Sequence, residues 1–250
     1  VLAGAALVCC EDTRRTGRLL QHAGIRAERL AVANDHTEAQ RVAEVLDLLA
    51  AGRDIAVVTD AGTPGISDPG ERLVRAALDA GHPVSAVPGP AAAVMALVVS
   101  GLPTARFVFE GFLTRTGRDR SARLAEIAAE RRTVVLYEAP HRIERTMADL
   151  RAACGDDRRV AVARELTKLY EDVTRGTLGD IEIASPRGEY VVVVEGARAE
   201  PVVADDDAIR AALRSELAAG ATKKEAVSAV SSRLGAPHRT VYALAVTVSA

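Results

Sequence analysis

The chain has 250 residues, of which 48% are hydrophobic and 26% are charged, a composition typical of a globular protein with one large domain or two smaller ones. The net charge of −2 excludes a basic field over the whole molecule, so a nucleic-acid partner requires a local basic face. No apolar stretch approaches the roughly 18 residues of a membrane-spanning helix, and we expect a cytoplasmic protein that does not enter a membrane. The three cysteines, Cys9, Cys10 and Cys154, lack metal-ligand spacing, so we interpret them as buried thiols and expect no metal.

The first hundred residues alternate between short strands rich in β-branched residues and helical patterns. Thr37 and Gln40 have the spacing of a capping box at the start of one helix. Strands that alternate with helices favour a parallel sheet with right-handed crossovers. In chain order the pattern predicts a strand over residues 5–10, a helix over 13–23, a helix over 37–51, a strand over 54–59, a helix over 69–80, a strand over 84–87 and a helix over 90–100.

The pattern changes near Pro103, because fewer helices separate the later strands. This favours a mixed or antiparallel sheet. A charged helix is predicted between the first two of these strands, and another helix over residues 140–153. The predicted strands are 106–109, 133–137, 160–164, 171–177 and 190–195, and helices follow over 207–219, 222–234 and 237–249.

We therefore predict an α/β protein with four parts. They are an N-terminal α/β domain with a parallel sheet (1–105), an α/β domain with a mixed sheet (106–197), a charged linker (198–206) and a helical module (207–250). Parallel α/β domains usually place a ligand loop after their first strand, and nothing before Cys10 supplies one. We expect the N-terminal domain to be incomplete at its start.

Residues 59–70 follow a buried strand and precede a helix, and they contain three glycines and two prolines. In an open α/β sheet, ligands lie outside the carboxyl ends of the strands. A merely structural turn at this position usually has about two to six residues, so the length favours a binding loop. The loop has neither Gly-Lys-Ser/Thr nor Gly-x-Gly-x-x-Gly, which argues against a nucleoside triphosphate and a nicotinamide cofactor.

Further polar or small-residue segments follow other predicted strands: 11–15, 87–92, 137–142, 164–171 and 188–190. Helix starts, surface ion pairs and close helix packing are the alternatives for these segments. Residues 223–246 resemble a helix-turn-helix with Gly235 in the turn and Arg239 on the following helix, although a plain helical hairpin has the same pattern.

Taken together, these motifs resemble the ribosomal RNA small subunit methyltransferase I family, which belongs to the tetrapyrrole-methylase-like superfamily. The matching motifs occur in the family's order and cover nearly the whole chain: 10–15, 58–70, 87–92, 109–112, 136–142, 164–171 and 188–194. The resemblance implies the two-domain tetrapyrrole-methylase-like fold with an added helical module. The family begins with a strand and a cofactor loop that have no counterpart here.

The resemblance also implies S-adenosylmethionine (S-adenosyl-L-methionine) as methyl donor, held between the two domains of the chain. It further implies that the protein is a homodimer. The acceptor it implies is the ribose 2′-hydroxyl of a cytidine in the decoding region of 16S rRNA, as free RNA or in the 30S subunit. The residues it assigns to the cofactor are Asp60, Ala61, Gly62, Thr63, Pro64, Ile66, Pro90, Ala91, Tyr137, Leu166 and Glu189.

Charged residues at the predicted strand ends are candidates for catalysis and RNA binding. A ribose hydroxyl is a poor nucleophile, so a base or a field that lowers its pKa is expected to help. The catalytic candidates are Asp12, Arg14, Glu138, Glu165 and Lys168, and the sequence does not rank the acids. The RNA-binding candidates are Arg14, Arg15, Arg142, Arg164 and Arg239.

Two other functions remain open at this stage. The same fold with an acid-binding trough would methylate a tetrapyrrole precursor, but the C-terminal helices would then have no role. A ligand-sensing regulator with a helix-turn-helix would bind duplex DNA with a steep salt dependence.

Overall fold

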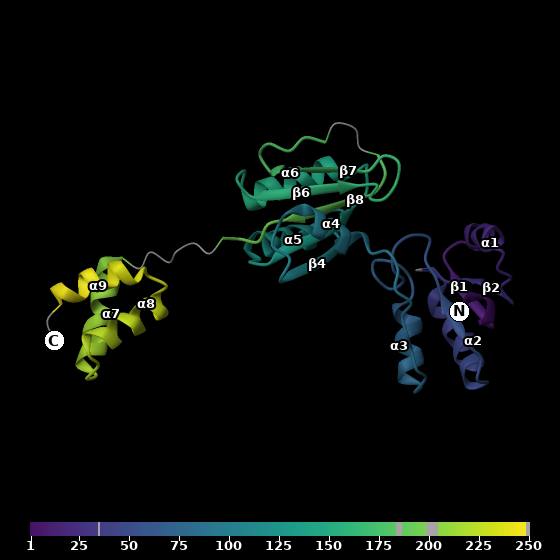
Figure 1. The fold of residues 1–250 in the computed structure, drawn as a ribbon, viewed down its shortest axis with the longest axis horizontal. Helices are drawn as coiled ribbons and strands as arrows, with labels where there is room; N and C mark the ends of the chain where they lie inside the picture. The colour runs from purple at the N-terminus through teal and green to yellow at the C-terminus, as the bar shows by residue number, and fades with distance from the viewer. Residues whose placement is uncertain (35, 184–186, 199–204, 249–250) are drawn as a thin grey trace. The chain divides into compact units, whose positions relative to one another are not determined.

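The computed structural model describes residues 1–34, 36–183, 187–198 and 205–248. The chain divides into two compact units, Val1–Ala197 and Arg198–Ala250 (Figure 1). No helix in these described ranges has both the length and the apolar character needed to cross a membrane.

A three-stranded sheet with the order β2-β1-β3 forms the first part of the larger unit, and all its pairings are parallel as predicted. The central strand is completely buried because its neighbours cover both of its edges and helices pack on the sheet. The elements are the short 3-10 helix η1 (Leu2–Gly4), β1 (Leu7–Cys10), α1 (Thr13–His22), β2 (Leu30–Val32), α2 (Glu38–Ala50), β3 (Ile55–Val57) and α3 (Glu71–Asp79).

A five-stranded mixed sheet with the order β4-β5-β8-β6-β7 forms the rest of this unit. Only β4 and β5 are parallel, and the other three pairings are antiparallel, as the change of pattern predicted. The elements are α4 (Ala92–Ser100), β4 (Phe107–Phe112), α5 (Arg118–Ala129), β5 (Thr133–Glu138), α6 (Ile143–Cys154), β6 (Arg159–Arg164), β7 (Asp172–Thr177) and β8 (Tyr190–Val194).

The middle strand β8 is buried on both faces, which explains its unbroken run of valines. Val192 and Val194 pack in a core with side chains of α5 and α6. Val191 and Val193 point to the opposite face, where they pack with α4. The sheet therefore lies between α4 on one face and α5 with α6 on the other (Figure 1).

The smaller unit consists of three helices around one apolar core: α7 (Asp206–Ala218), α8 (Lys223–Leu234) and α9 (His238–Thr247). A capping box of Thr222 and Glu225 starts α8. Gly235 ends it in the left-handed conformation, and α9 begins three residues later. Most of the predicted linker lies outside the described residues.

The buried thiols are confirmed for Cys9 and Cys10, which are free and buried, whereas Cys154 is half-buried. Burial raises the pKa of the Cys9 thiol to about 11, so it stays protonated at neutral pH.

The predicted strand over residues 84–87 is wrong. Residues 82–91 have no regular secondary structure, and the side chains of Val84 and Val87 are 44% and 72% exposed. A strand needs a neighbour with which to exchange hydrogen bonds, and the described residues provide none for this segment. The three-residue strand β2, by contrast, was not predicted, because it is too short to show a period.

The predicted capping box of Thr37 and Gln40 is also wrong. The Thr37 hydroxyl donates to the carbonyl of Val32 and to Asn34 instead of capping α2. The Asn34 side chain accepts from the backbone N–H groups of His36 and Thr37, so it holds the turn before the helix.

The carboxylate of Glu38, in the first turn of α2, caps the next helix in the chain. It is buried, and its Oε1 accepts from the N–H groups of Gly70, Arg72 and Leu73 at 2.9, 3.0 and 3.3 Å. A helix N-terminus leaves such donors without intrahelical partners, and a negative charge there also complements the helix dipole. Glu38 therefore fixes the end of the 59–70 loop at the start of α3.

Replacing Glu38 with alanine is expected to lower the free energy of unfolding by about 1–3 kcal/mol, because three backbone donors, two of them buried, lose their acceptor. Glu38→Gln should lose less, since its amide oxygen still accepts. Urea denaturation measures both, with Glu71→Ala as the control, because Glu71 is exposed in the first turn of α3. Equal losses in Glu38→Ala and Glu71→Ala would contradict this role.

Candidate functional site

The carboxyl ends of β1 and β3 are joined by charged side chains. Glu11 accepts hydrogen bonds from the Thr59 hydroxyl and, at 2.9 Å, from the N–H of Asp60. Arg15 reaches across to the Asp60 carboxylate at 3.0 Å. The structure thus brings two predicted site residues, Arg15 and Asp60, into direct contact. Glu11 holds the backbone of Asp60 beside them.

Asp12 and Arg14 form a local pair at the start of α1. Asp12 is the helix N-cap and accepts from the backbone N–H of Arg14 at 2.8 Å, while the Arg14 guanidinium contacts both carboxylate oxygens. The bonds from Arg14 hold the pKa of Asp12 well below its usual range. Asp12 therefore stays ionised at neutral pH, and its low proton affinity makes it a weak base.

The 59–70 loop is closed by its own backbone. The N–H of Gly65 donates to the carbonyl of Pro69 at 3.1 Å, and Gly62 and Gly65 have φ values of 78° and 79°. Gly70 has a φ of 136°, and such positive φ angles favour glycine, which explains all three glycines of the loop. The Thr63 hydroxyl donates to the carbonyl of Pro90 at 3.1 Å, so the loop is linked to the segment that enters α4.

The same loop also approaches β4. A β-bulge interrupts that strand between Phe109 and Gly111, and Gly111 has a φ of 62°. A Cβ on Gly111 would lie 3.2 Å from the Ser67 hydroxyl, so the bulge and its glycine leave room for the loop.

Tyr137, near the carboxyl end of β5, is the residue on which several loops converge. Its hydroxyl accepts from the N–H of Ala93 at 3.2 Å, and its ring packs edge-on against Phe109 with centroids 5.0 Å apart. Burial raises the pKa of the Tyr137 hydroxyl, and the negative charges of Asp68 and Glu189 raise it further. The 59–70 loop, the start of α4 and the segment before β8 therefore all influence this side chain.

Glu138 follows Tyr137 and is completely buried. Its carboxylate accepts from the N–H of Ala139 at 2.9 Å and from the Thr146 hydroxyl at 2.6 Å, and it pairs with Arg142 at 3.2 Å. A buried charge is tolerated only when it is paired and hydrogen-bonded, and this one is.

Arg120 extends this network to the loop that follows β4. It is 4% exposed and donates to the Thr146 hydroxyl, to Asp149 and to the carbonyl of Thr114, all at 2.8–2.9 Å. Arg142 donates to the neighbouring carbonyl of Leu113. The network therefore holds the 113–117 segment against the start of α6.

Glu165 and Lys168 form an exposed ion pair of 3.0 Å at the end of β6. Glu165 and Thr167 have φ values of 50° and 66°, which are uncommon for residues with a side chain. A Cβ on Gly188 would overlap with the Glu165 carboxylate, so the glycine permits this close approach. The structure thus places Glu165 beside the segment that carries Glu189.

The other predicted residues have varied environments. Arg164 lies 4.0 Å from Asp172 and is half-buried. Leu166 packs in the core shared with α4. Arg239 is exposed on α9 in the smaller unit. The remaining cofactor candidates are exposed or half-buried: Ala61, Pro64, Ile66 and Ala91.

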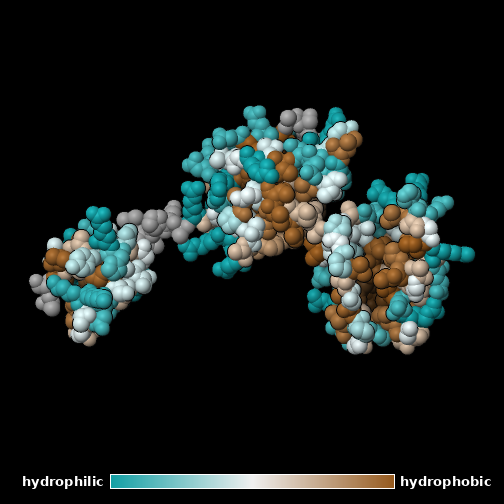
Figure 2. Space-filling view, viewed as in Figure 1, coloured by the Kyte–Doolittle hydropathy of each residue, from teal (hydrophilic) through white to brown (hydrophobic). Residues whose placement is uncertain are grey.

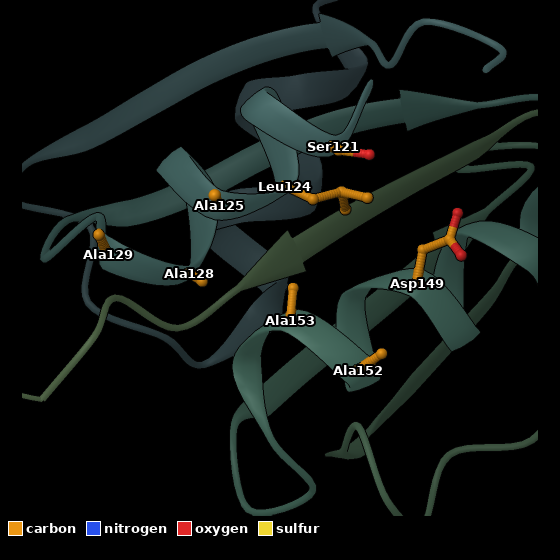
Figure 3. Close-up of a pocket in the computed structure, with 8 residues that line it drawn as sticks. All are labelled: Ser121, Leu124, Ala125, Ala128, Ala129, Asp149, Ala152 and Ala153. Carbon is orange, nitrogen blue, oxygen red and sulfur yellow. The ribbon is translucent and has the colours of Figure 1, made fainter. Parts of the chain in front are cut away.

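Two concave surfaces lie on the α5–α6 side of the mixed sheet. The larger, of about 650 Å³, is a groove between the helices whose lining is mostly alanine (Figure 3). Ser121 and Asp149 are its only polar lining residues, so it offers little for specific chemistry. The smaller, of about 350 Å³, is lined by Arg115, Thr116, Arg120, His141, Arg142, Arg145 and Thr146.

The described residues contain no group of three or more His, Cys, Asp or Glu side chains that could hold a metal ion. Sequence reasoning also missed several residues that shape the site. Glu11 was noted only as part of a polar run, while Glu38 and Arg120 gave no signal, because their partners are distant in the chain.

Comparison with known proteins defines the class first. Residues 1–182 match the family of tetrapyrrole (corrin/porphyrin) methylases. The crystal structure of the methyltransferase CobJ superposes with a TM-score of 0.54 and 22% identity, covering 78% of this chain and 96% of that one, which shows a shared fold. The tetrapyrrole-methylase-like fold predicted from the sequence is thereby confirmed.

Relatives with higher sequence identity identify the family within this class of methylases. Ribosomal RNA small subunit methyltransferase I of Synechocystis sp. is 44% identical, with coverage of 98% of this chain and 89% of the relative. The protein of the same name from Mycobacterium tuberculosis is 45% identical, with coverage of 92% and 81%. The chain belongs to the ribosomal RNA small subunit methyltransferase I family within the tetrapyrrole methylases.

Thr146→Val is expected to lower the free energy of unfolding by about 1–3 kcal/mol, because valine keeps the shape but removes the hydroxyl that joins Glu138 to Arg120. Thr116→Val is the control, since Thr116 is exposed. Urea denaturation of the two variants measures the difference. A loss in Thr146→Val no larger than in Thr116→Val would show that the network adds no stability.

Proposed function

We propose that this protein transfers a methyl group from S-adenosylmethionine to the 2′-hydroxyl of a cytidine ribose in the decoding region of 16S rRNA. The observation that carries the proposal is that the 59–70 loop, the start of α4 and Tyr137 meet, through the hydrogen bonds from Thr63 to Pro90 and from Ala93 to Tyr137. Membership of the ribosomal RNA small subunit methyltransferase I family supports the choice of RNA as acceptor.

The residues around this convergence fit the proposed cofactor. The exposed backbone of Ala61, Gly62 and Thr63 offers polar groups at close range, since the glycine carries no side chain. The Asp60 carboxylate is an acceptor for an amino or ribose hydroxyl group. We assign the cofactor to these residues together with Pro64, Ile66, Pro90, Ala91, Tyr137, Leu166 and Glu189.

When bound, S-adenosylmethionine supplies an activated methyl group, whose bond to sulfur breaks as its bond to the ribose oxygen forms while the hydroxyl proton leaves to a base or to solvent. The protein's main task is then to align the acceptor hydroxyl, and orientation contributes up to about 7–11 kcal/mol in favourable cases. Loops fixed by Glu11, Glu38 and the Thr63–Pro90 bond are suited to this task.

The three candidate acids differ in how their environment suits proton removal. Glu138 is completely buried, so we assign it a positioning role. Asp12 has a lowered pKa and both oxygens on Arg14, which favours an electrostatic role over a basic one. Glu165 is 22% exposed and beside Lys168, and we propose it as the acid that faces the acceptor.

Arg14, Arg15 and Lys168 are exposed and suited to contacts with RNA phosphates. The side chains of Arg142 and Arg164 are 18% and 24% exposed, and we propose them as further positive charges that face the RNA. Arg239 adds a positive charge on α9, where Tyr242 is also exposed. The presence of an exposed arginine and an exposed tyrosine on the same helix supports a role for the helical module in RNA binding.

We also propose a homodimer and a cytoplasmic location, where a ribosomal substrate is found. The hydrophobic side chains exposed on α4 support the dimer, because Val94, Met95 and Val98 are 47%, 44% and 64% exposed. Figure 2 shows hydrophobic surface on the body that contains this helix. Light scattering of the purified protein measures the subunit number.

Calorimetry and a transfer assay test the proposed activity directly. We expect S-adenosylmethionine to bind, and its labelled methyl group to appear in 16S rRNA when 30S subunits are the acceptor. Uroporphyrinogen is the competing acceptor for this fold and should receive none. Transfer to uroporphyrinogen without transfer to RNA would make the protein a tetrapyrrole methylase in activity as well as in fold.

Arg14→Ala and Lys168→Ala are each expected to reduce methylation of 30S subunits by about tenfold, the loss of one charge-assisted hydrogen bond, while S-adenosylmethionine binds nearly as before. Arg75→Ala is the matched control, since Arg75 is 72% exposed on α3. Methylation rates and calorimetry give the two readouts. If cofactor affinity falls as far as methylation, the assignment of these residues to RNA is wrong.

A further inference from the structure

The 350 Å³ pocket between the 113–117 segment and the start of α6 contains more positive charge than its partners neutralise. Four arginines line it: Arg115, Arg120, Arg142 and Arg145. The carboxylates in contact with them are Glu138, which pairs with Arg142, and Asp149, which pairs with Arg120 at 2.8 Å and lies 3.8 Å from Arg145. An excess of two positive charges is left.

These charges are arranged in two layers. Arg120 and Arg142 are 4% and 18% exposed and are held by backbone carbonyls of the 113–117 segment, so they form a fixed floor. Arg115 and Arg145 are exposed at the rim, and Arg115 has no carboxylate partner among the described residues. A fixed floor with an exposed rim is suited to an anion that enters from solvent.

Other groups at the pocket favour an anion with several oxygen acceptors. Thr116 and His141 lie at the rim and carry further polar groups. The first turn of α6, which starts at Ile143, adds the positive end of its helix dipole. Guanidinium groups match the geometry of phosphate oxygens, and arginine is the preferred residue for such recognition.

We infer that this pocket binds a phosphate group of the RNA backbone and so holds the RNA outside the methyl-transfer site. The choice of RNA as the source of the phosphate rests on the proposed function. The pocket and Tyr137 lie on segments that meet at the end of β5, because Glu138 anchors the pocket floor and directly follows Tyr137. A phosphate held here therefore fixes the RNA relative to the loops around Tyr137.

The test removes the rim and leaves the floor intact. The double variant Arg115→Gln/Arg145→Gln changes two exposed side chains, whereas substitution of Arg120 would disturb the fold. The matched control is Arg75→Gln/Arg106→Gln, which removes the same charge from exposed positions outside the pocket. Fluorescence anisotropy measures the affinity of each protein for a single-stranded 16S rRNA fragment over a range of salt concentrations.

We expect the rim variant to bind the RNA about tenfold more weakly than the control at low salt. The slope of log affinity against log salt should also fall by about 0.7, the value for one lost phosphate contact. S-adenosylmethionine affinity should stay unchanged. Equal RNA affinity and equal slope in rim variant and control would overturn the inference.

Two further arms separate other outcomes. Inorganic phosphate is titrated against the bound RNA fragment, and displacement from the wild type but not from the rim variant supports the pocket. Binding of phosphate at the rim with no effect on RNA affinity would overturn the choice of RNA. Failure of the wild type to methylate 30S subunits would instead refute the proposed function. In that case, a loss of RNA affinity confined to the rim variant would still show that the pocket binds RNA phosphate.

Discussion

The buried carboxylate of Glu138 is the interaction on which the functional end of the mixed sheet depends. It has no contact with water, so its charge must be balanced within the protein. Arg142 balances the charge, Thr146 donates a hydrogen bond to the carboxylate, and Arg120 continues the chain of hydrogen bonds to the segment after β4. One charge at the end of β5 thereby fixes the start of α6, the floor of the arginine pocket and the backbone beside Tyr137.

The loops of the parallel sheet are fixed by the same means. Glu11 holds the beginning of the 59–70 loop, and Glu38 holds its end through three backbone donors. Each carboxylate comes from a different segment and satisfies N–H or hydroxyl groups that a loop cannot satisfy alone. Three of the twelve residues of this loop are glycines, which have no side chain to fix the backbone, so neighbouring segments supply much of its order.

The sequence predicted most elements because their signals are local, while the errors involve partners far apart in the chain. The predicted strand over 190–195 contains β8, and the predicted helix over 69–80 contains α3. The strand over 84–87 has the right residues but no neighbour, and Glu38 caps a helix that starts 33 residues later. At the site, the candidate residues could be chosen from the sequence because they follow predicted strands. Only the structure showed that the Arg14 guanidinium binds the Asp12 carboxylate and that Arg115 and Arg142 line the same pocket.

The distribution of charge explains how a chain with a net charge of −2 is compatible with the polyanionic substrate that we propose. Many arginines are held by nearby acids, as in the pairs Arg53–Glu28 and Arg151–Asp156, so they add little field beyond the pair. The arginine pocket differs because its four arginines are in contact with only two carboxylates, Glu138 and Asp149. In the proposed function, a local excess within a nearly neutral molecule attracts phosphate at one place without binding nucleic acid over the whole surface. Such an arrangement favours alignment of the proposed ribose acceptor over general affinity, and alignment is the contribution that methyl transfer requires from the protein.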